Sequence, residues 1–206
     1  MIVNDNDRVI LRYLEKWDYI TASQATYLLG RKTEGQKKYI LKRLNFLADN
    51  GYIVKNDFPR NFFGDNKENI YSRKKLKEYP NQHTLILMSY ICYLHGFFKG
   101  IEVIGREFDW KPIKVKSDAL ICFKYRGSYY YQIVEVVNST HVDNFYKYLE
   151  LYKANIFQDM VEAEIFPLIV VIDNRHRRFD YEKYKPLQFV FLDKNFNGFD
   201  KILQLL

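Results

Sequence analysis

The chain has 206 residues, a formal net charge of +7 and 48% hydrophobic residues, including 18 tyrosines and 16 phenylalanines. This length suits one large domain or two small ones, and the hydrophobic content excludes a disordered chain. No apolar run is long enough to span a membrane, and the first residues lack a signal-peptide pattern. Because Cys92 and Cys122 lie in apolar contexts, we expect reduced thiols and a cytoplasmic protein without membrane association.

The positive charge is concentrated in the first part of the chain. Residues 1–80 contain 16 Lys and Arg against 10 Asp and Glu, an excess of +6. Residues 81–206 contain 16 against 15, an excess of only +1. A basic footprint confined to one segment favours a polyanion bound there, and the alternative is a lysine-rich surface with no ligand.

Two helices are predicted before residue 30. Residues 5–17 carry apolar side chains at helical spacing and begin with acidic residues, which favour a helix start. Thr21 is a suitable N-cap for a short second helix over residues 22–29, which Gly30 would end. A turn over residues 31–35 then leads into the third helix.

The third helix is predicted over residues 33–51, with Thr33 as N-cap and Gly51 at the C-terminal end. Its polar side chains are expected to lie off the apolar stripe and therefore to face solvent or a ligand. The stripe consists of Ile40, Leu41, Leu44, Leu47 and Ala48, and the residues off it are Gln36, Lys38, Lys42 and Arg43.

A strand, a loop and a return strand follow the third helix. Residues 52–58 alternate as a strand, residues 59–69 are rich in turn-forming residues, and residues 69–73 form the return strand. The segments YITASQATYLL and LKRLNFLADNGYIVK, in this order of elements, resemble the winged helix-turn-helix family over residues 5–77. A solvated basic helix and a winged helix that binds protein remain alternatives.

The winged-helix resemblance implies that the third helix enters the major groove of double-stranded DNA and that the wing contacts the backbone or minor groove. Gln36 and Arg43 have side chains that can read bases, whereas the lysines are expected to position the protein on phosphates. The implied DNA contacts are Arg31, Lys32, Gln36, Lys38, Lys42 and Arg43 on the turn and helix, and Arg60, Lys67, Arg73 and Lys74 on the wing.

A charged stretch ending at Pro80 predicts a boundary between a domain of residues 1–78 and a domain of residues 79–206. An antiparallel meander followed by a crossover helix predicts an α/β domain with a mixed sheet, so the whole chain is α+β. The expected helices cover 83–99, 143–157 and 199–206, and the expected strands cover 101–109, 114–125, 129–138, 166–172 and 188–192.

Two acids in the second domain stand in apolar strands. Asp118 is the second residue of SDALICF and Glu135 lies within IVEVV, where an unpaired carboxylate is costly. These strands resemble the restriction-endonuclease-like PD-(D/E)xK fold, in which two acids bind a divalent cation and a lysine helps to activate water. Val137 occupies the expected lysine position, although Lys147 or Lys153 can substitute in principle. Glu107 is a further candidate acid.

Both halves together resemble the replication-relaxation family of Gram-positive plasmids and mobile elements, on the Ser-Asp-Ala strand start, VEVVN and KYLELY. The resemblance implies a non-enzymatic accessory protein for replication, relaxation or conjugative transfer, with no cofactor. The implied partners are DNA repeats in an origin or promoter, a relaxase or replication initiator, and a second copy in a homodimer.

Two other functions are compatible with the sequence. The first is a metal-dependent nuclease that uses Asp118 and Glu135 to bind Mg²⁺, with Lys147 as the catalytic lysine. The second is a winged-helix transcriptional regulator with a C-terminal sensing or dimerisation domain.

Overall fold

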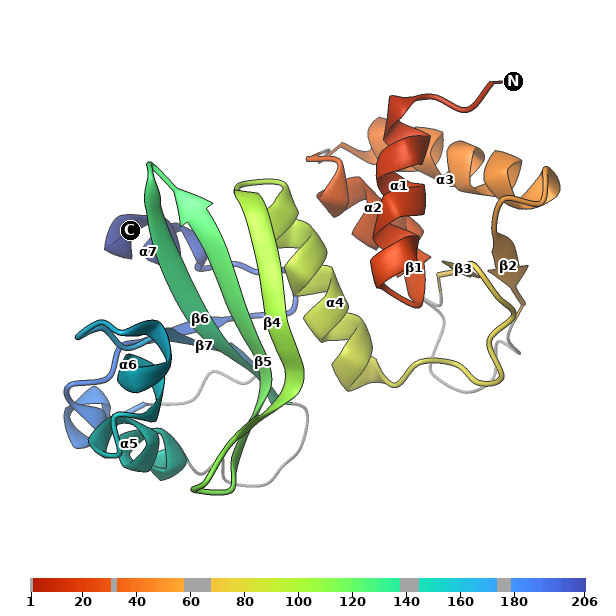
Figure 1. The fold of residues 1–206 in the computed structure, drawn as a ribbon. Coiled ribbons are helices and arrows are strands. Elements are labelled where there is room, and N and C mark those ends of the chain that lie inside the picture. Colours follow the sequence, from red (N-terminus) through yellow and green to blue (C-terminus); the bar gives the residue numbers. More distant parts are fainter. Residues whose placement is uncertain (1, 31–32, 58–67, 138–144, 174–178) are drawn as a thin grey trace. The chain divides into compact units, whose positions relative to one another are not determined.

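The computed structural model describes residues 2–30, 33–57, 68–137, 145–173 and 179–206 (Figure 1). They form two compact units, residues 1–97 and 98–206, within an α+β protein. In these described ranges, no helix combines the length and the apolar character needed to cross a membrane.

Three helices form the first part of the first unit, namely α1 (Asp5–Lys16), α2 (Ala22–Leu28) and α3 (Glu34–Asp49). Each begins with a capping box, in which an N-cap side chain and the side chain three residues later bond to each other's backbone amides. The N-caps are Asn4, Thr21 and Thr33. These helices agree with the sequence prediction to within two residues at each end.

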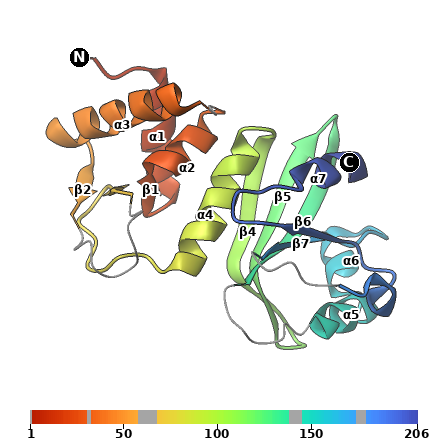
Figure 2. The ribbon, with the colours of Figure 1, turned by 180° about the vertical axis from the view of Figure 1, so that it is seen from behind.

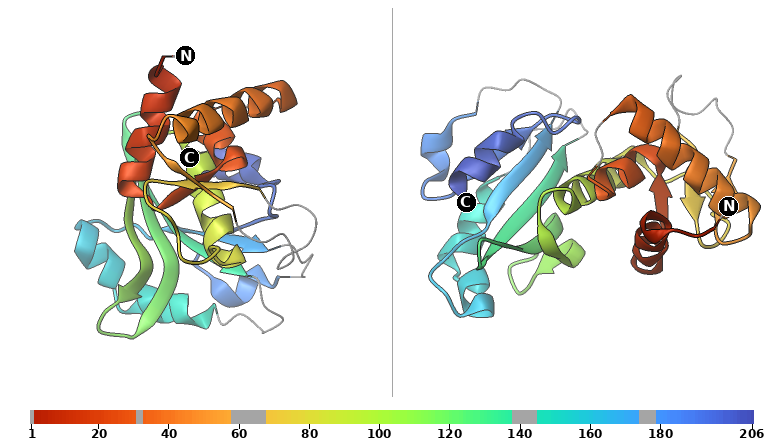
Figure 3. Two further views of the ribbon diagram at one scale, coloured as in Figure 1. Left: turned by 90° about the vertical axis from the view of Figure 1, so that its right-hand side faces the viewer. Right: turned by 90° about the horizontal axis from the view of Figure 1, so that it is seen from above.

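Three short strands form an antiparallel sheet in the order β1-β3-β2, at the end of the first unit where α1 and α3 finish (Figures 1 and 3). They are β1 (Tyr19–Thr21), β2 (Val54–Asn56) and β3 (Ile70–Ser72). The predicted strand pair corresponds to β2 and β3. The sequence did not predict β1, because three residues are too few to display an alternating pattern, and β1 is stabilised by pairing with the distant β3.

Helix α4 (Gln82–His95) belongs to the first unit and packs on α2. The Gln24 amide donates hydrogen bonds of 3.2 Å to the Leu85 carbonyl and to the Ser89 hydroxyl. The backbones approach closely, because a Cβ at Gly96 would lie 3.1 Å from the Tyr27 carbonyl oxygen. The chain therefore passes from the first unit to the second after residue 97, whereas the sequence placed the domain boundary before this helix, at residue 78, on the charged stretch alone.

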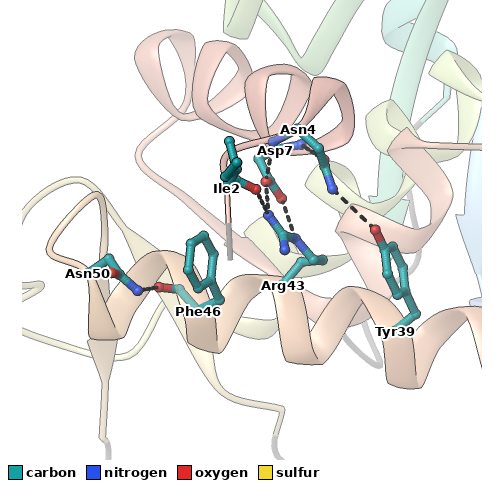
Figure 4. Close-up of polar contacts among 7 residues, drawn as sticks. All are labelled: Ile2, Asn4, Asp7, Tyr39, Arg43, Phe46 and Asn50. Atoms are coloured by element: carbon teal, nitrogen blue, oxygen red, sulfur yellow. Dashed lines mark hydrogen bonds and ion pairs between the residues drawn. The ribbon is translucent and has the colours of Figure 1, made fainter.

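An ion pair buried between α1 and α3 joins Arg43 to Asp7 (Figure 4). The Arg43 Nε donates to Asp7 Oδ1 at 3.0 Å, a second guanidinium nitrogen donates to Asp7 Oδ2, and that nitrogen also donates to the Ile2 carbonyl at 2.8 Å. The same carboxylate accepts the Asn4 amide at 2.8 Å in the capping box of α1. The pair thus connects the first turn of α1 with the middle of α3.

The second unit contains a five-stranded mixed sheet in the order β4-β5-β6-β7-β8. Strands β4 to β6 are antiparallel neighbours, while β6, β7 and β8 run parallel. This confirms the predicted mixed sheet, and the parallel part follows the segment that contains the crossover helices. The strands are β4 (Lys99–Trp110), β5 (Val115–Tyr125), β6 (Ser128–Val137), β7 (Leu168–Asp173) and β8 (Phe189–Leu192).

Helices cover both faces of this sheet (Figure 2). Buried side chains of α5 (Tyr146–Lys153) and α6 (Ile156–Val161) pack with Leu120 and Ile133 on one face. On the other face, Phe98 contacts both Phe123 and Phe199, the first residue of α7 (Phe199–Leu205). A 3-10 helix, η2 (Tyr181–Tyr184), precedes β8.

The single helix predicted over residues 143–157 is instead two helices in its described part. Asn155, between α5 and α6, has a positive φ of 53°, which a continuous right-handed helix does not allow. Residues 143 and 144 lie outside the described part of the chain.

We expect Asp7→Asn to destabilise the first unit by about 3 kcal/mol, because Arg43 keeps its charge in a buried site without a counter-ion. Urea unfolding measures this change. The matched control is Asp5→Asn in the same helical turn, where the side chain is 97% exposed and a change within about 0.5 kcal/mol is expected. Equal effects of the two substitutions would contradict a structural role for the buried pair.

Candidate functional site

The exposed face of α3 carries Lys38 and Lys42. They are four residues apart, so their side chains leave the same side of the helix. Neither lysine forms an ion pair with another residue in the described part of the chain. Their exposure agrees with the predicted position off the apolar stripe, and within the described residues they present two unpaired cations to solvent.

Two other polar residues of this helix are engaged within the fold. The Gln36 side-chain oxygen accepts the Thr33 amide at 3.0 Å, so paired hydrogen bonds from Gln36 to a base would require the cap to open. Lys37 lies 2.6 Å from Glu68, which also accepts the Ser23 amide. Burial alone would raise the pKa of Glu68, but the bonds from Lys37 and Ser23 outweigh it and hold the pKa below its ordinary value.

Arg43 was predicted to lie on the exposed face of α3, but it is buried. Its side chain is 5% exposed and is held by Asp7 and the Ile2 carbonyl (Figure 4). The hydrogen bonds that Arg43 donates to the Asp7 carboxylate raise the pKa of the guanidinium further above its ordinary value, although burial opposes this. A charged residue on a helix is usually solvated, and here its partner stands 36 positions earlier in the sequence. Arg43 is therefore a structural residue of the first unit rather than a base-reading one.

Two of the four predicted wing residues, Arg73 and Lys74, lie in the described part of the chain. Arg73 and Lys74 follow β3 and are exposed, and Arg73 lies 3.6 Å from Glu15 in a solvent-exposed ion pair of small stabilising effect. The remaining predicted contacts lie outside the described residues. They are Arg31, Lys32, Arg60 and Lys67.

In the second unit, Asp118 and Glu135 lie side by side on β5 and β6. Ala119 faces Val134 in the strand register, so Asp118 and Glu135 are the next cross-strand neighbours on one face of the sheet. The Asp118 Oδ2 accepts the Val136 amide at 2.6 Å. The sheet thus brings together the two acids that the sequence singled out.

The first turn of α5 places a lysine and a tyrosine against Glu135. The Lys147 Nζ donates to Glu135 Oε1 at 2.6 Å and to the Lys116 carbonyl at 2.7 Å. The Tyr148 hydroxyl donates to the same Glu135 oxygen from a fully buried position. Sequence reasoning named Lys147 as a possible substitute but missed Tyr148, because its burial arises only when α5 packs on the sheet.

Glu135 is held in an environment that disfavours its charge. Its side chain is 13% exposed, and this burial raises the pKa of the carboxyl above its ordinary value. The Lys147 cation opposes the shift and the Asp118 carboxylate reinforces it. Burial, with Glu135 close by, also raises the pKa of Tyr148 well above its usual value. A raised carboxyl pKa is typical of proton-transferring groups, and burial of a structural carboxyl group has the same effect.

The other candidates in this unit lie apart from the pair or in apolar contacts. Val137 pairs with Asp173 of β7 and packs partly against the core, while Lys153, at the last position of α5, is exposed. Glu107 is exposed on β4 with a positive φ of 48°. No group of three or more metal-binding side chains gathers among the described residues. Two carboxylates on one face can still hold Mg²⁺, which keeps several waters and often takes only one or two protein carboxylates.

We expect Glu135→Gln to be more stable than the wild type at neutral pH. A glutamate whose pKa is raised by folding makes its full contribution to stability below the unfolded pKa of about 4.3, and that contribution is lost as the pH rises through the folded pKa. Glutamine stays neutral and avoids this loss. Urea unfolding should show a gain at pH 7 that vanishes at acidic pH, whereas the exposed Glu150→Gln should show neither effect. A gain independent of pH would contradict the linkage.

No protein-family model matches this sequence, and no curated protein matches it either.

Proposed function

We propose that the protein binds double-stranded DNA in a sequence-specific manner through α3. The observation that carries this proposal is the pair of exposed lysines, Lys38 and Lys42, on the outer face of that helix, which form no ion pair within the described residues. Cations spaced in this way along a helix suit the phosphates that border a major groove. Base reading would fall to side chains that border this pair.

Two further observations support a DNA-binding role for the first unit. Its order of helix, strand, two helices and two strands, with the three strands joined in one sheet, matches the winged helix-turn-helix pattern. Nearly all of the net charge of +7 comes from residues 1–80, where the excess is +6. A basic surface of this kind can neutralise DNA phosphates and release their counterions, which favours binding.

The process in which we place this activity is replication, relaxation or conjugative transfer of a plasmid or mobile element. A winged helix followed by a mixed sheet that carries Asp118 and Glu135 supports this, because the resemblance to the replication-relaxation family implies the same order. We propose a homodimer acting on repeats in an origin or promoter, with a relaxase or replication initiator as partner. A transcriptional regulator would instead occupy only its own promoter.

We expect Lys38→Ala together with Lys42→Ala to weaken binding to duplex DNA about tenfold. The slope of log affinity against log salt concentration should fall by roughly 1.8, because two phosphate contacts are lost. Fluorescence anisotropy with a labelled duplex from the flanks of the protein's own gene, titrated at several salt concentrations, measures both quantities.

The control variant is Lys183→Ala together with Lys185→Ala. These side chains are 61% and 69% exposed on the second unit, and their loss removes the same net charge. Affinity in the control should stay within about twofold of the wild type. Equal losses in both variants would mean that binding follows net charge rather than α3.

A second candidate function is a metal-dependent nuclease, which the 2.6 Å contact between Lys147 and Glu135 favours. Lys147 comes from the helix that follows β6. It would serve as the catalytic lysine, because the expected lysine position is occupied by the uncharged Val137. Asp118 and Glu135 would hold a Mg²⁺ ion, which supplies Lewis-acid activation of water and phosphate. Lys147 would orient the attacking water and balance the negative charge, and Tyr148 would fix the Glu135 carboxylate.

If this second candidate holds, supercoiled DNA should be nicked only with Mg²⁺, and both Glu135→Gln and Lys147→Ala should lower the rate about 100-fold or more. Lys153→Ala is the matched control, because it removes an exposed lysine from the far end of the same helix. Agarose-gel assays of nicking report the rate. Absence of cleavage by the wild-type protein in Mg²⁺ and in Mn²⁺ would leave the Glu135 cluster a structural one.

A further inference from the structure

A cross-strand row of one tyrosine and two lysines crosses the second unit's sheet near the β5–β6 turn. Lys99 on β4 faces Lys124 on β5, and Lys124 faces Tyr129 on β6. Directly paired residues on neighbouring strands have side chains on the same face, so the three side chains share one surface. The Lys124 ammonium lies 5.5 Å from the centre of the Tyr129 ring.

The three consecutive tyrosines that follow Ser128 at the start of β6 have different surroundings. Tyr129 is 63% exposed. Tyr130 stacks on Phe123 and donates its hydroxyl to the Leu206 carbonyl at 2.9 Å. Tyr131 meets Phe157 edge-on at 5.1 Å in the core. Only Tyr129 therefore offers most of its ring to solvent, and neither the core nor α7 needs it there.

The turn beside this row carries another cation. Arg126 and Gly127 join β5 to β6, and both have positive φ angles, of 48° and 92°. A two-residue turn of this kind favours asparagine, aspartate or glycine at its first position, yet here an arginine occupies it. The Arg126 guanidinium lies 5.1 Å from the centre of the Tyr125 ring. Tyr125 alternates with Lys124 along β5, so this cation and ring lie toward the face of the sheet opposite to the row.

The two facing lysines are unfavourable for the fold by itself. Like charges directly opposite each other on neighbouring strands are destabilising. Within the described ranges, no ion pair neutralises Lys99, Lys124 or Arg126. The carboxylate nearest to the row along these strands is that of Glu102. It pairs with Cys122, which lies two residues from Lys124 on β5 and on the same face of the sheet. An anion bound from outside would remove the repulsion.

We propose that this row, Lys99, Lys124 and Tyr129, binds single-stranded nucleic acid. The cations contact successive phosphates, and an unpaired base stacks on the exposed Tyr129 ring. A duplex keeps the faces of its bases covered, so an exposed aromatic ring among cations suits a single strand better. This site goes beyond the proposed duplex binding by α3, because all of its residues belong to the other compact unit.

Anisotropy of a labelled oligothymidylate with the full-length protein tests the proposal. Tyr129→Ala should weaken binding about tenfold through loss of one stacking contact, and Tyr129→Phe should restore it. Lys124→Thr should lower the salt slope by roughly 0.7, the value for one phosphate contact on a single strand. The same substitution removes the like-charge pair, so its unfolding midpoint in urea should not fall.

Two controls separate this site from α3 and from general surface effects. Lys38→Ala with Lys42→Ala should weaken duplex binding but leave oligothymidylate binding unchanged. Tyr129→Ala should weaken oligothymidylate binding but leave duplex binding unchanged. Tyr181→Ala removes another exposed tyrosine, 51% exposed, from the same unit and should have no effect. The proposal is overturned if the wild type does not bind the oligonucleotide at low salt, if Tyr129→Ala binds as the wild type does, or if the α3 variant abolishes both activities.

Discussion

The first unit depends on the buried ion pair between Arg43 and Asp7. Two ionised groups removed from water are stable only when each satisfies the other and the remaining hydrogen bonds are made. Here the carboxylate also accepts the Asn4 amide, and the guanidinium also holds the Ile2 carbonyl. One pair therefore sets how α1, its cap and α3 pack together, and it determines which side of α3 is left for solvent.

The orientation of α3 follows from this constraint and decides its chemistry. With Arg43 turned inward, the outward cations of its central turns are Lys38 and Lys42, while Lys37 is held by Glu68. Lysines act as point charges and contact phosphate without reading sequence. Sequence specificity in the proposed interface would then depend on neighbouring side chains and on DNA shape, rather than on a bidentate arginine of this helix.

Local patterns in the sequence predicted most of the elements, because caps, apolar stripes and turn residues act over a few positions. Thr33 and Thr21 marked helix starts correctly, and the mixed sheet followed from the order of segments. What the sequence could not predict depends on distant partners. Arg43 looked solvent-facing until Asp7 was found beside it, β1 exists only through β3, and Tyr148 meets Glu135 only because α5 packs on β6.

Adjacent phenylalanines mark the passage between the two units. The Phe97 ring contacts Tyr93 at 5.0 Å within the first unit, while the next ring along the chain, Phe98, stacks on Phe123 at 4.2 Å within the second. Two consecutive residues thus contact different units, so the chain has no glycine- or serine-rich linker at this boundary. In the nucleic-acid binding proposed for each unit, the length of a flexible linker therefore does not enter the effective concentration of one site near the other, because residues 97 and 98 are consecutive.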